Sequence, residues 1–585
     1  MSWSKARRLR LAAAVVGLAA IAGVVAAVAL RPSSSESTES EPAGRPFAAP
    51  ESGEGGAAPV SQVATGQGAT APQYVVSTKN DTSPELRSLP IIPPQAREES
   101  EEEEMGEPRR APLAPKGTPD KDPIVQSAAP VSGMPAPVAN FSGIDNVWGY
   151  YPPDTNGEIG RDAYLQTVNA GFQFFSRDGT PLTPIADNNT IWQGFGGPCE
   201  TSNEGDPVAL YDQLADRWIM SQFAWDNFYT GPYYECVAVS ASSDPLGSWH
   251  RYEILSPNKT FPDYPKLGVW TDGYYLTTDE FYVRGATYLW AGVGAWALER
   301  AKMLAGQPAG LIYTHLPPSQ WGGMLPADID GKTLPPAGSP EYFVEVDDSA
   351  WDPANIPNDR IEVWAYRVSW DAPASSTFTK TTELHQSPFD GILCGFANCV
   401  PQKDTSQKLD TLTYFTMFRA SYRNFGKYES ILINHTVDVG DGTTERAGIR
   451  WYEVRNPSSP VLYQEGTFAP DDGIWRWTGS IAQDSAGDIA VGYSGSSATT
   501  FPDIRYAGRL AKDPKGLLAQ GESTLYAGNG SQTGSAGRWG DYADITVDPA
   551  DDCTFWFTTE YMPATSYNSW STRIGAFKFP GCRSR

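Results

Sequence analysis

The chain has 585 residues, a formal net charge of -25 at pH 7 and a pI near 4.6. This length exceeds what one ordinary hydrophobic core supports, unless the fold is built from repeats. The acidic composition offers no Lys/Arg stripe to neutralise phosphates, so it argues against a nucleic-acid partner.

Residues 1–31 have the pattern of a targeting segment. Four basic residues within positions 5–10 precede an uncharged run over 11–30. A basic flank holds its end in the cytoplasm, which predicts that the rest of the chain is extracytoplasmic. The run is as long as a bilayer needs, roughly 20 residues. This favours a membrane anchor over a cleaved signal peptide, although Ala27-Val28-Ala29 fits cleavage and a secreted product.

Residues 32–140 are predicted to form a disordered stalk. Pro, Ser, Gly, Ala and Glu dominate, an acidic run over 98–104 repels itself, and the few apolar residues have no sustained period. A solvated spacer between a membrane segment and a folded domain follows from this composition.

Residues 141–585 are predicted to be an all-β propeller. The stretch over 538–561, RWGDYADITVDPADDCTFWFTTEY, indicates two antiparallel strands joined at an acidic turn, and looser copies recur upstream. Inner strands are predicted to begin near Asp162, Asp206, Asp263, Asp328, Tyr414, Trp477 and Asp541. These starts predict seven four-stranded blades, and the poor patterning over 332–410 leaves six as the alternative.

The six cysteines all lie in the predicted propeller, and in an extracytoplasmic location cysteines are expected to form disulfides. Their places in the blades predict the pairs Cys199–Cys236, Cys394–Cys399 and Cys553–Cys582. A zinc site is the rival interpretation, but no C-x-x-C occurs and histidine is scarce.

Polar residues at the inner-strand starts are the candidate ligand site, because the first residues of these strands meet at one mouth of a propeller channel. The candidates are Asp263, Tyr264, Lys266, Arg476, Arg538 and Asp541. Converging arginines would grip a carboxylate, and nearby carboxylates would supply an acid and a base. In the alternative interpretation, the pairs Arg476-Trp477 and Arg538-Trp539 are structural. Each guanidinium then stacks on an aromatic ring and forms an ion pair with a neighbouring Asp between blades.

The run Asp263-Tyr264-Pro265-Lys266 is the least ordinary of these starts. Pro265 cannot donate to a sheet ladder, so it belongs at a strand beginning or a bulge, where a side chain is aimed at a ligand. We therefore expect Asp263 and Lys266 to share one polar pocket with Arg538 and Asp541.

No cofactor is predicted, with calcium as the alternative for one acidic stretch. Asp154, Asn156 and Glu158 gather oxygen ligands in a turn-like segment, although their spacing is not that of an EF-hand. Asp and Asn before Gly are also ordinary turn residues.

Several long stretches resemble a widespread group of uncharacterised secreted bacterial proteins with propeller-like domains. They include GDPVALYDQLADRWIMSQFA, RWTGSIAQDSAGDIAVGYS and the stretch over 538–561, and the resemblance covers residues 141–582. More distantly, Ser242 to Trp249 (SSDPLGSW) is similar to the Asp box of sialidase-type propellers, except that Gly247 stands three residues after Asp244 and not two. In that family the motif stabilises a turn, so the resemblance implies fold and not catalysis.

Two function classes follow from these patterns. In the first, a propeller tethered to the cell surface binds an extracellular glycan, polymer or protein at its channel mouth, and contacts the membrane only through its N-terminal segment. In the second, it is a sialidase-like glycoside hydrolase or lyase acting on an anionic sugar. No G-x-S-x-G elbow or other decisive catalytic motif occurs, so the sequence leaves the enzyme question open.

Overall fold

The computed structural model describes residues 68–95, 122–130, 133–285, 287–440 and 444–583. The prediction of an anchor or signal peptide over 1–31 lies outside these residues. Among the residues described, no helix is long and apolar enough to cross a bilayer. All of them belong to one structural unit, Gln62–Arg585.

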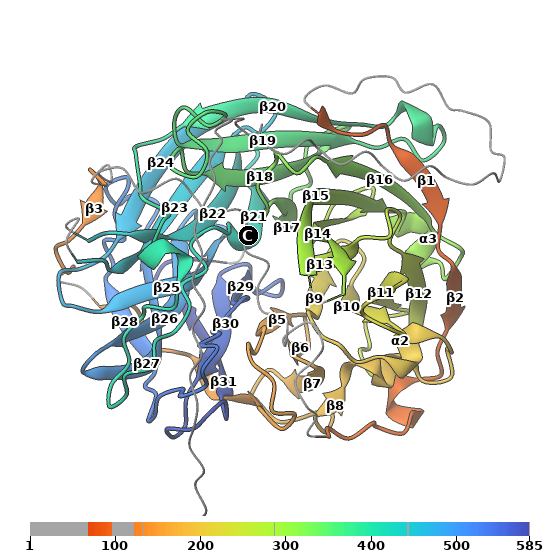
Figure 1. Cartoon of the computed structure of the whole chain (residues 1–585), viewed down its shortest axis with the longest axis horizontal. Coiled ribbons are helices and arrows are strands. Elements are labelled where there is room, and N and C mark those ends of the chain that lie inside the picture. Colours follow the sequence, from red (N-terminus) through yellow and green to blue (C-terminus); the bar gives the residue numbers. More distant parts are fainter. Residues whose placement is uncertain (1–67, 96–121, 131–132, 286, 441–443, 584–585) are drawn as a thin grey trace, which may run out of the picture. The chain divides into compact units, whose positions relative to one another are not determined.

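The described strands form seven antiparallel blades around a common centre (Figure 1). From inner to outer strand, blades 1 to 3 are β5 (Asn156–Ile159), β6 (Ala163–Val168), β7 (Gly171–Ser176), β8 (Ala186–Asp187); β9 (Val208–Asp212), β10 (Arg217–Trp225), β11 (Tyr233–Ser240), β12 (Trp249–Leu255); and β13 (Phe261–Val269), β14 (Tyr274–Arg284), β15 (Thr287–Leu298), β16 (Gly310–Leu316). In the same order, blades 4 and 5 are β17 (Leu325–Asp330), β18 (Glu341–Asp347), β19 (Arg360–Arg367), β20 (Thr377–His385); and β21 (Met417–Asn424), β22 (Glu429–Asp438), β23 (Ala447–Arg455), β24 (Val461–Phe468). Blades 6 and 7 are β25 (Trp475–Gln483), β26 (Ile489–Ser497), β27 (Thr500–Arg509), β28 (Glu522–Tyr526); and β29 (Asp544–Val547), β30 (Thr554–Tyr561), β31 (Ser571–Lys578), β4 (Ala139–Asp145). The short helices are η2 (Leu86–Ser88), η3 (Asn188–Trp192), α2 (Pro198–Thr201), α3 (Arg300–Leu304), η4 (Pro373–Ser375) and η5 (Cys394–Phe396).

The inner strands form a closed ring, and we call the interior of this ring the channel. Each of them contacts the inner strand of the next blade, and β29 contacts β5. Blades 4 and 5 are additionally joined edge to edge, because β17 and β21 pair in parallel. The prediction of a seven-bladed propeller is therefore confirmed, and the ring brings residues far apart in sequence to each end of one channel.

The last blade is completed by a strand from the N-terminal side of the propeller. β4 pairs antiparallel with β31, with Phe141 opposite Ile574 and Ala139 opposite Ala576. Closing the ring in this way pairs a strand from the N-terminal side of the propeller with the C-terminal strand β31, which is then paired on both sides, and β4 becomes the outer strand of the blade.

The segment predicted as a stalk is partly folded, which corrects the boundary at residue 140. β1 (Gln73–Val76) adds a fifth strand to blade 3 on β16, and β2 (Lys79–Thr82) adds one to blade 2 on β12. β3 (Val125–Gln126) lies in parallel on β24 of blade 5. The sequence signal is weak because these short outer strands are held by backbone hydrogen bonds to an existing sheet edge, with few buried side chains.

The predicted inner strand of blade 1 is also wrong. Asp162 precedes β6, the second strand, and the inner strand is β5, with the sequence NGEI. Gly and Asn are poor strand formers, so the pattern of the longer aromatic strand β6 dominated the prediction. The starts near Asp206, Asp263, Asp328, Tyr414, Trp477 and Asp541 do lie at or within a few residues of inner strands.

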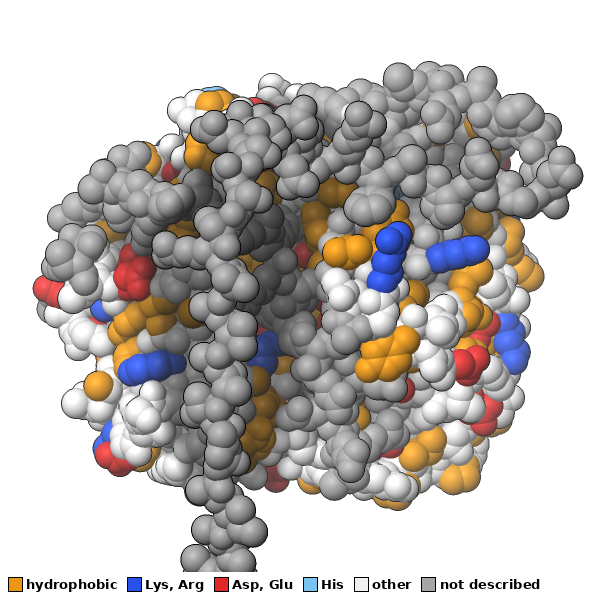
Figure 2. All heavy atoms as spheres, viewed as in Figure 1, with side chains coloured by type: hydrophobic (Ala, Val, Ile, Leu, Met, Phe, Trp, Pro, Cys, Tyr) orange, Lys and Arg blue, Asp and Glu red, His pale blue; other side chains and the backbone are white. Residues whose placement is uncertain are grey.

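Packing between the blades is dominated by aromatic side chains. Trp218, Trp296 and Trp364 are all buried to within 1% of full burial, and the ring of Trp218 packs against Phe174 of the neighbouring blade at 5.6 Å. On the described part of the face drawn in Figure 2, side chains of both charge signs are scattered among hydrophobic ones. The clusters of buried charged side chains described below lie instead on and beside the inner strands.

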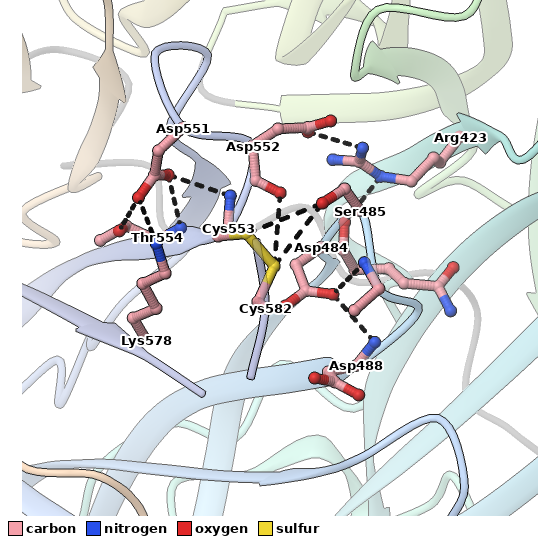
Figure 3. The surroundings of a disulfide bond; sticks show 12 residues. Arg423, Asp484, Ser485, Asp488, Asp551, Asp552, Cys553, Thr554, Lys578 and Cys582 are labelled. Atoms are coloured by element: carbon pink, nitrogen blue, oxygen red, sulfur yellow. Dashed lines mark hydrogen bonds and ion pairs between the residues drawn. A yellow bond between two sulfur atoms is a disulfide. The ribbon is translucent and has the colours of Figure 1, made fainter. Parts of the chain in front are cut away.

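All three predicted disulfides are confirmed. The pairs are Cys199–Cys236, Cys394–Cys399 and Cys553–Cys582, with Cα atoms 5.7, 6.2 and 5.7 Å apart. Figure 3 shows Cys553–Cys582 beside Ser485, whose Oγ lies 3.5 Å from the Cys582 sulfur. This bond links the start of β30 to the segment after β31. Three disulfides fit an extracellular protein.

Replacing both Cys553 and Cys582 with serine should lower the free energy of unfolding by about 2 to 4 kcal/mol, because the bond closes a long loop in the unfolded chain. The matched control is Cys394→Ser with Cys399→Ser. Its cysteines are 5 residues apart and not 29, so loop entropy predicts a loss smaller by about 1.5 kcal/mol. Denaturant unfolding measures both losses, and equal losses would contradict the loop-entropy explanation.

Candidate functional site

The inner strands begin at one end of the channel, which we call the strand-start mouth. Five residues at this end have left-handed backbone: Asp154 (φ 47°), Asp206 (φ 43°), Tyr264 (φ 52°), Thr478 (φ 48°) and Asp541 (φ 62°). They belong to blades 1, 2, 3, 6 and 7. This conformation is costly for residues other than glycine and clusters at functional sites, so its recurrence at one level of the ring marks this mouth as the candidate site.

A carboxyl pair, Asp154 and Asp206, joins blades 1 and 2 at this mouth. Asn169 bridges the two residues, since its Nδ2 donates to Asp154 Oδ2 at 2.9 Å and its Oδ1 accepts from the Asp206 backbone N–H at 3.0 Å. Gly205 permits this approach, because a Cβ there would overlap Asn169 Oδ1. Both carboxyl groups are almost completely buried.

Lys266 lies beside this pair, in the bulge predicted from Pro265. The pairing of β13 with β14 shifts register between Asp263 and Lys266, as expected for a bulge. Lys266 is 1% exposed, and its Nζ has no hydrogen-bond partner among the described residues. It sits 3.0 Å from the ring centroid of Tyr264 and 3.2 Å from that of Tyr542. The ammonium is therefore held between two aromatic faces.

Blade 7 contributes an arginine and an aspartate to the same mouth. Arg538 Nη2 is hydrogen-bonded to Asp541 Oδ2, and the arginine side chain remains 19% exposed. The backbone carbonyl of Asp541 accepts a hydrogen bond from Tyr264 Oη at 2.7 Å. Tyr542 Oη donates to the Pro265 carbonyl at 2.9 Å and lies 3.3 Å from Asp206 Oδ2. Tyr264, Lys266, Arg538 and Asp541 thus lie together at this mouth, and Asp263 precedes Tyr264, whose backbone N–H donates to Asp263 Oδ1 at 2.8 Å.

An aromatic run leads from this mouth towards solvent. The ring of Tyr264 packs on Phe415 at 4.3 Å, and Phe415 packs on Tyr414 at 4.3 Å. Phe415 and Tyr414 are half-buried, whereas Tyr264 is buried. The mouth therefore combines charged groups inside with partly exposed aromatic surface outside.

The electrostatics of the mouth favour a mixture of protonated and ionised groups. Burial raises the pKa of Asp154 well above its usual value, and the charges of Asp206 and Asp541 raise it further. Burial also raises the pKa of Asp541 to about 6, against the opposing charge of Arg538. For Lys266 burial lowers the pKa, while nearby aspartates, Asp206 foremost, oppose this effect. Burial raises the pKa of Asp206 as well, against the charges of Lys266 and Arg538, so burial favours the protonated form of both carboxyl groups of this pair.

The candidate set missed two glutamates that belong to this region. Glu235 of β11 and Glu560 of β30 are completely buried. Burial raises the pKa of Glu235, helped by Asp206, and raises that of Glu560 to about 7. Both come from the second or third strand of a blade and not from an inner-strand start. The sequence signal was a glutamate inside an otherwise apolar or aromatic strand.

Replacing Glu560 with glutamine should stabilise the protein at pH 8 and not at pH 5. The folded pKa of about 7 exceeds the ordinary value of 4.5. The wild-type protein therefore loses stability as the pH rises from about 4 to 7, whereas the glutamine variant does not titrate. The gain at pH 8 should reach about 3 kcal/mol. Unfolding at both pH values measures it, with exposed Glu85→Gln as control, and an equal difference at both pH values would contradict the assignment.

Arg476 is not part of the site, which corrects its place among the candidates. Its Nη2 lies 2.6 Å from Asp472 and 2.7 Å from Glu522 of β28, so its side chain runs along blade 6 away from the channel. The guanidinium also lies 5.5 Å from the ring of Phe468. Arg476 fits the alternative interpretation of a structural residue, and Arg538 is the arginine left at this mouth from the two Arg-Trp pairs.

A second polar cluster fills the middle of the channel. Arg419 of β21 binds Asp328 at 2.7 Å and Asp330 at 2.8 Å, both from β17. Glu158 and Asp544 are buried beside it, and burial raises the pKa of both, against the charge of Arg419. We call these five residues the Arg419 cluster. It separates the strand-start mouth from the opposite end of the channel.

The calcium candidates are divided between these clusters. Asp154 lies at the strand-start mouth, Glu158 lies in the Arg419 cluster, and Asn156 Oδ1 accepts from the backbone N–H of Ala209 at 2.8 Å. No group of three or more His, Cys, Asp or Glu side chains arranged to hold a metal ion occurs among the described residues.

The segment similar to an Asp box forms the turn between β11 and β12. Asp244 Oδ1 accepts from the backbone N–H of Leu246 at 3.0 Å, and Trp249 Nε1 donates to the Pro245 carbonyl at 3.0 Å. These bonds stabilise the turn, as the resemblance implies.

No family model and no curated protein matches this chain. Among solved structures, it is similar to an α-L-arabinofuranosidase from Fusarium graminearum, with a TM-score of 0.32 and 9% identity, over 78% of this chain and 99% of that one. It is also similar to an ulvan lyase, a polysaccharide lyase (TM-score 0.32, 11% identity, 77% of this chain and 94% of that one). A third is the Trypanosoma rangeli sialidase (TM-score 0.27, 9% identity, 63% of this chain and 54% of that one). Likenesses at this level do not transfer site residues.

Proposed function

We propose that this protein is an extracytoplasmic β-propeller that binds a glycan at its strand-start mouth and is held at the cell surface by its N-terminal segment. The three disulfides support the extracytoplasmic location. The basic and apolar pattern over residues 1–31 supports the tether.

One observation carries the choice of ligand. Lys266 is buried without a hydrogen-bond partner among the described residues, next to the Asp154–Asp206 pair. The mouth therefore offers hydrogen-bond donors and acceptors at close quarters, which is what a polyol needs because each hydroxyl both donates and accepts. The aromatic run through Phe415 and Tyr414 adds apolar surface for the C–H faces of a sugar ring.

Catalysis on a glycan is the second candidate. The Asp154–Asp206 pair, with the pKa of both carboxyl groups raised by burial, has the character of a general acid with its partner base. Sialidase-like binding of a carboxylate has less support, because Arg419 and Arg476 are both already bound to carboxylates of this protein. Binding without turnover is therefore the function we favour.

A glycan array, followed by assays on chromogenic glycosides and a lyase assay by ultraviolet absorbance, tests the proposal. We expect retention of a defined set of glycans and no release of product. Turnover that is lost in Asp206→Asn, with the fold retained, would replace binding by catalysis at the same mouth. No glycan retained by the wild-type protein, and no turnover, would overturn both candidates.

A further inference from the structure

The opposite end of the channel, which we call the turn-side mouth, contains a cavity of about 430 Å³. It lies where inner strands turn into second strands: Arg161 follows β5, Gln213 follows β9, Thr271 follows β13 and Lys332 follows β17. Arg300 of α3 completes the polar lining. This volume is within the range of small-molecule sites, roughly 300 to 1,000 Å³.

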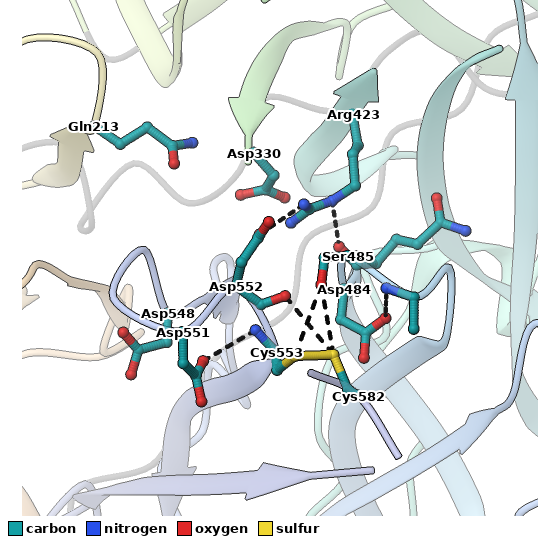
Figure 4. Close-up of polar contacts among 12 residues, drawn as sticks. Gln213, Asp330, Arg423, Asp484, Ser485, Asp548, Asp551, Asp552, Cys553 and Cys582 are labelled. Atoms are coloured by element: carbon teal, nitrogen blue, oxygen red, sulfur yellow. Dashed lines mark hydrogen bonds and ion pairs between the residues drawn. A yellow bond between two sulfur atoms is a disulfide. The ribbon is translucent and has the colours of Figure 1, made fainter. Parts of the chain in front are cut away.

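The charged side chains that line this cavity are all basic, in a protein of net charge -25. Acidic residues also lie at this mouth, but buried arginines bind them: Asp330 pairs with Arg419 at 2.8 Å, and Asp552 pairs with Arg423 at 2.6 Å. Figure 4 shows Gln213, Asp330 and Arg423 approaching this region from different blades. The cations of the lining have acidic partners of their own, since Arg300 binds Asp212 at 2.6 Å and Arg161 lies 3.8 Å from Asp216. An anionic ligand would therefore use the N–H donors that these pairs leave unused.

Arg300 is held in a fixed orientation. Its Nε and Nη2 donate to the two oxygens of Asp212 at 2.6 and 3.0 Å, and its Nη1 makes only one long bond, 3.5 Å, to the Thr271 carbonyl. A guanidinium has five N–H donors, so donors remain for a ligand at little cost in side-chain entropy. Arg161 and Lys332 are exposed. The ion pair of Arg161 with Asp216 is also exposed, so it is weak enough for a ligand to compete with it.

Gln213 adds hydroxyl recognition to this basic lining. Its Nε2 is bound to the Ile329 carbonyl at 2.5 Å, which fixes the amide plane. An amide oxygen accepts hydrogen bonds, so it suits a ligand hydroxyl and repels a bare anion. The lining therefore matches a molecule that carries both an anionic group and hydroxyls.

From this lining we infer that the turn-side mouth binds a small saccharide bearing a carboxylate, sulfate or phosphate group. Arg161, Arg300 and Lys332 hold the anionic group, and Gln213 orients the ring. The Arg419 cluster lies between the two mouths, so this site is separate from the strand-start mouth and does not rest on the proposed function.

Isothermal titration of the intact protein with glucuronic acid, glucose 6-sulfate, glucose 6-phosphate and glucose tests the inference. We expect at least one anionic sugar to bind at millimolar concentration and glucose to bind far more weakly. The preferred sugar identifies the anionic group. Arg161→Gln with Lys332→Gln should raise the Kd of that sugar by about tenfold or more, because it loses two charge-assisted bonds.

The matched control is Arg367→Gln with Lys512→Gln, which removes the same charge from exposed sites in blades 4 and 6. It should leave the Kd nearly unchanged, as should Lys266→Met at the strand-start mouth. Thermal unfolding checks that every variant is folded. The inference is overturned if no anionic sugar binds, if glucose binds equally well, or if the lining variant and its control weaken binding to the same extent.

Discussion

Replacing Arg419 with methionine should lower the free energy of unfolding by about 3 to 5 kcal/mol at neutral pH, since removing one partner of a buried ion pair leaves its carboxylates uncompensated. Arg419 is 1% exposed and binds Asp328 at 2.7 Å and Asp330 at 2.8 Å. Its charge also opposes the raised pKa of Glu158 and Asp544. It is the cation that all four of these acids share.

The loss should depend on pH in a defined direction. Burial raises the pKa of Asp328 to about 6, and Arg419 lowers it from a still higher value. Without Arg419 the carboxyl groups of Asp328, Glu158 and Asp544 bind protons more tightly in the folded protein, so the variant recovers stability as the pH falls from 8 to 5. Urea unfolding at both pH values measures this change.

Arg367→Met is the control, because it removes an exposed arginine on β19. It should change stability by no more than about 0.5 kcal/mol. A loss for Arg419→Met that is equally small, or one that grows as the pH falls, would show that the Arg419 cluster does not hold the channel together.

The double variant Lys266→Met with Arg538→Met should weaken glycan binding at the strand-start mouth by at least about a hundredfold, because a hydrogen bond to a charged group contributes roughly 1.5 to 3 kcal/mol. Thermal stability should stay nearly unchanged. Lys266 is buried without a hydrogen-bond partner among the described residues, so methionine of similar length removes a desolvated charge. Asp541, whose pKa of about 6 is already raised by burial, can take up a proton when Arg538 is absent.

Binding to the glycans retained on the array, measured beside thermal unfolding, checks this result. The matched control is Lys332→Met, which removes an exposed lysine at the other mouth. If the double variant unfolds and binding follows only its folded fraction, the two charges are scaffold and the glycan site lies elsewhere on the ring. If binding of anionic glycans alone is lost, the ligand of this mouth is an acidic sugar.

Several features could be predicted from sequence because their signal is local. The bulge at Lys266 follows from Pro265, which has no N–H to donate to a ladder. The pairing of Cys553 with Cys582 follows from their places at the ends of neighbouring strands. The recurring starts at Asp206, Asp263 and Asp541 share one turn chemistry, and this placed them at one mouth.

Other features had no local signal. β1 (QYVV) and β2 (KNDT) pair with the edges of β16 and β12. Nothing in these two short segments indicates which strands they pair with. Arg476 and Arg538 both precede a tryptophan, yet one pairs with Glu522 of an outer strand and the other with Asp541 at the mouth. The direction of a long side chain depends on which acid the neighbouring strands bring within reach.

Strand periodicity and turn residues act over a few positions, so the repeat, the class of fold and the pairing of the cysteines could be inferred from the sequence, which favoured seven blades over six. Which charges meet depends on the tertiary structure. Asp154 joins Asp206 across two blades, Arg419 neutralises acids from other strands, and the basic lining around Arg300 gathers on turns spread along the chain. Ring closure brings these side chains together, and burial then sets their pKa values. Neither effect has a local signal in the sequence, because the residues concerned are dozens or hundreds of positions apart.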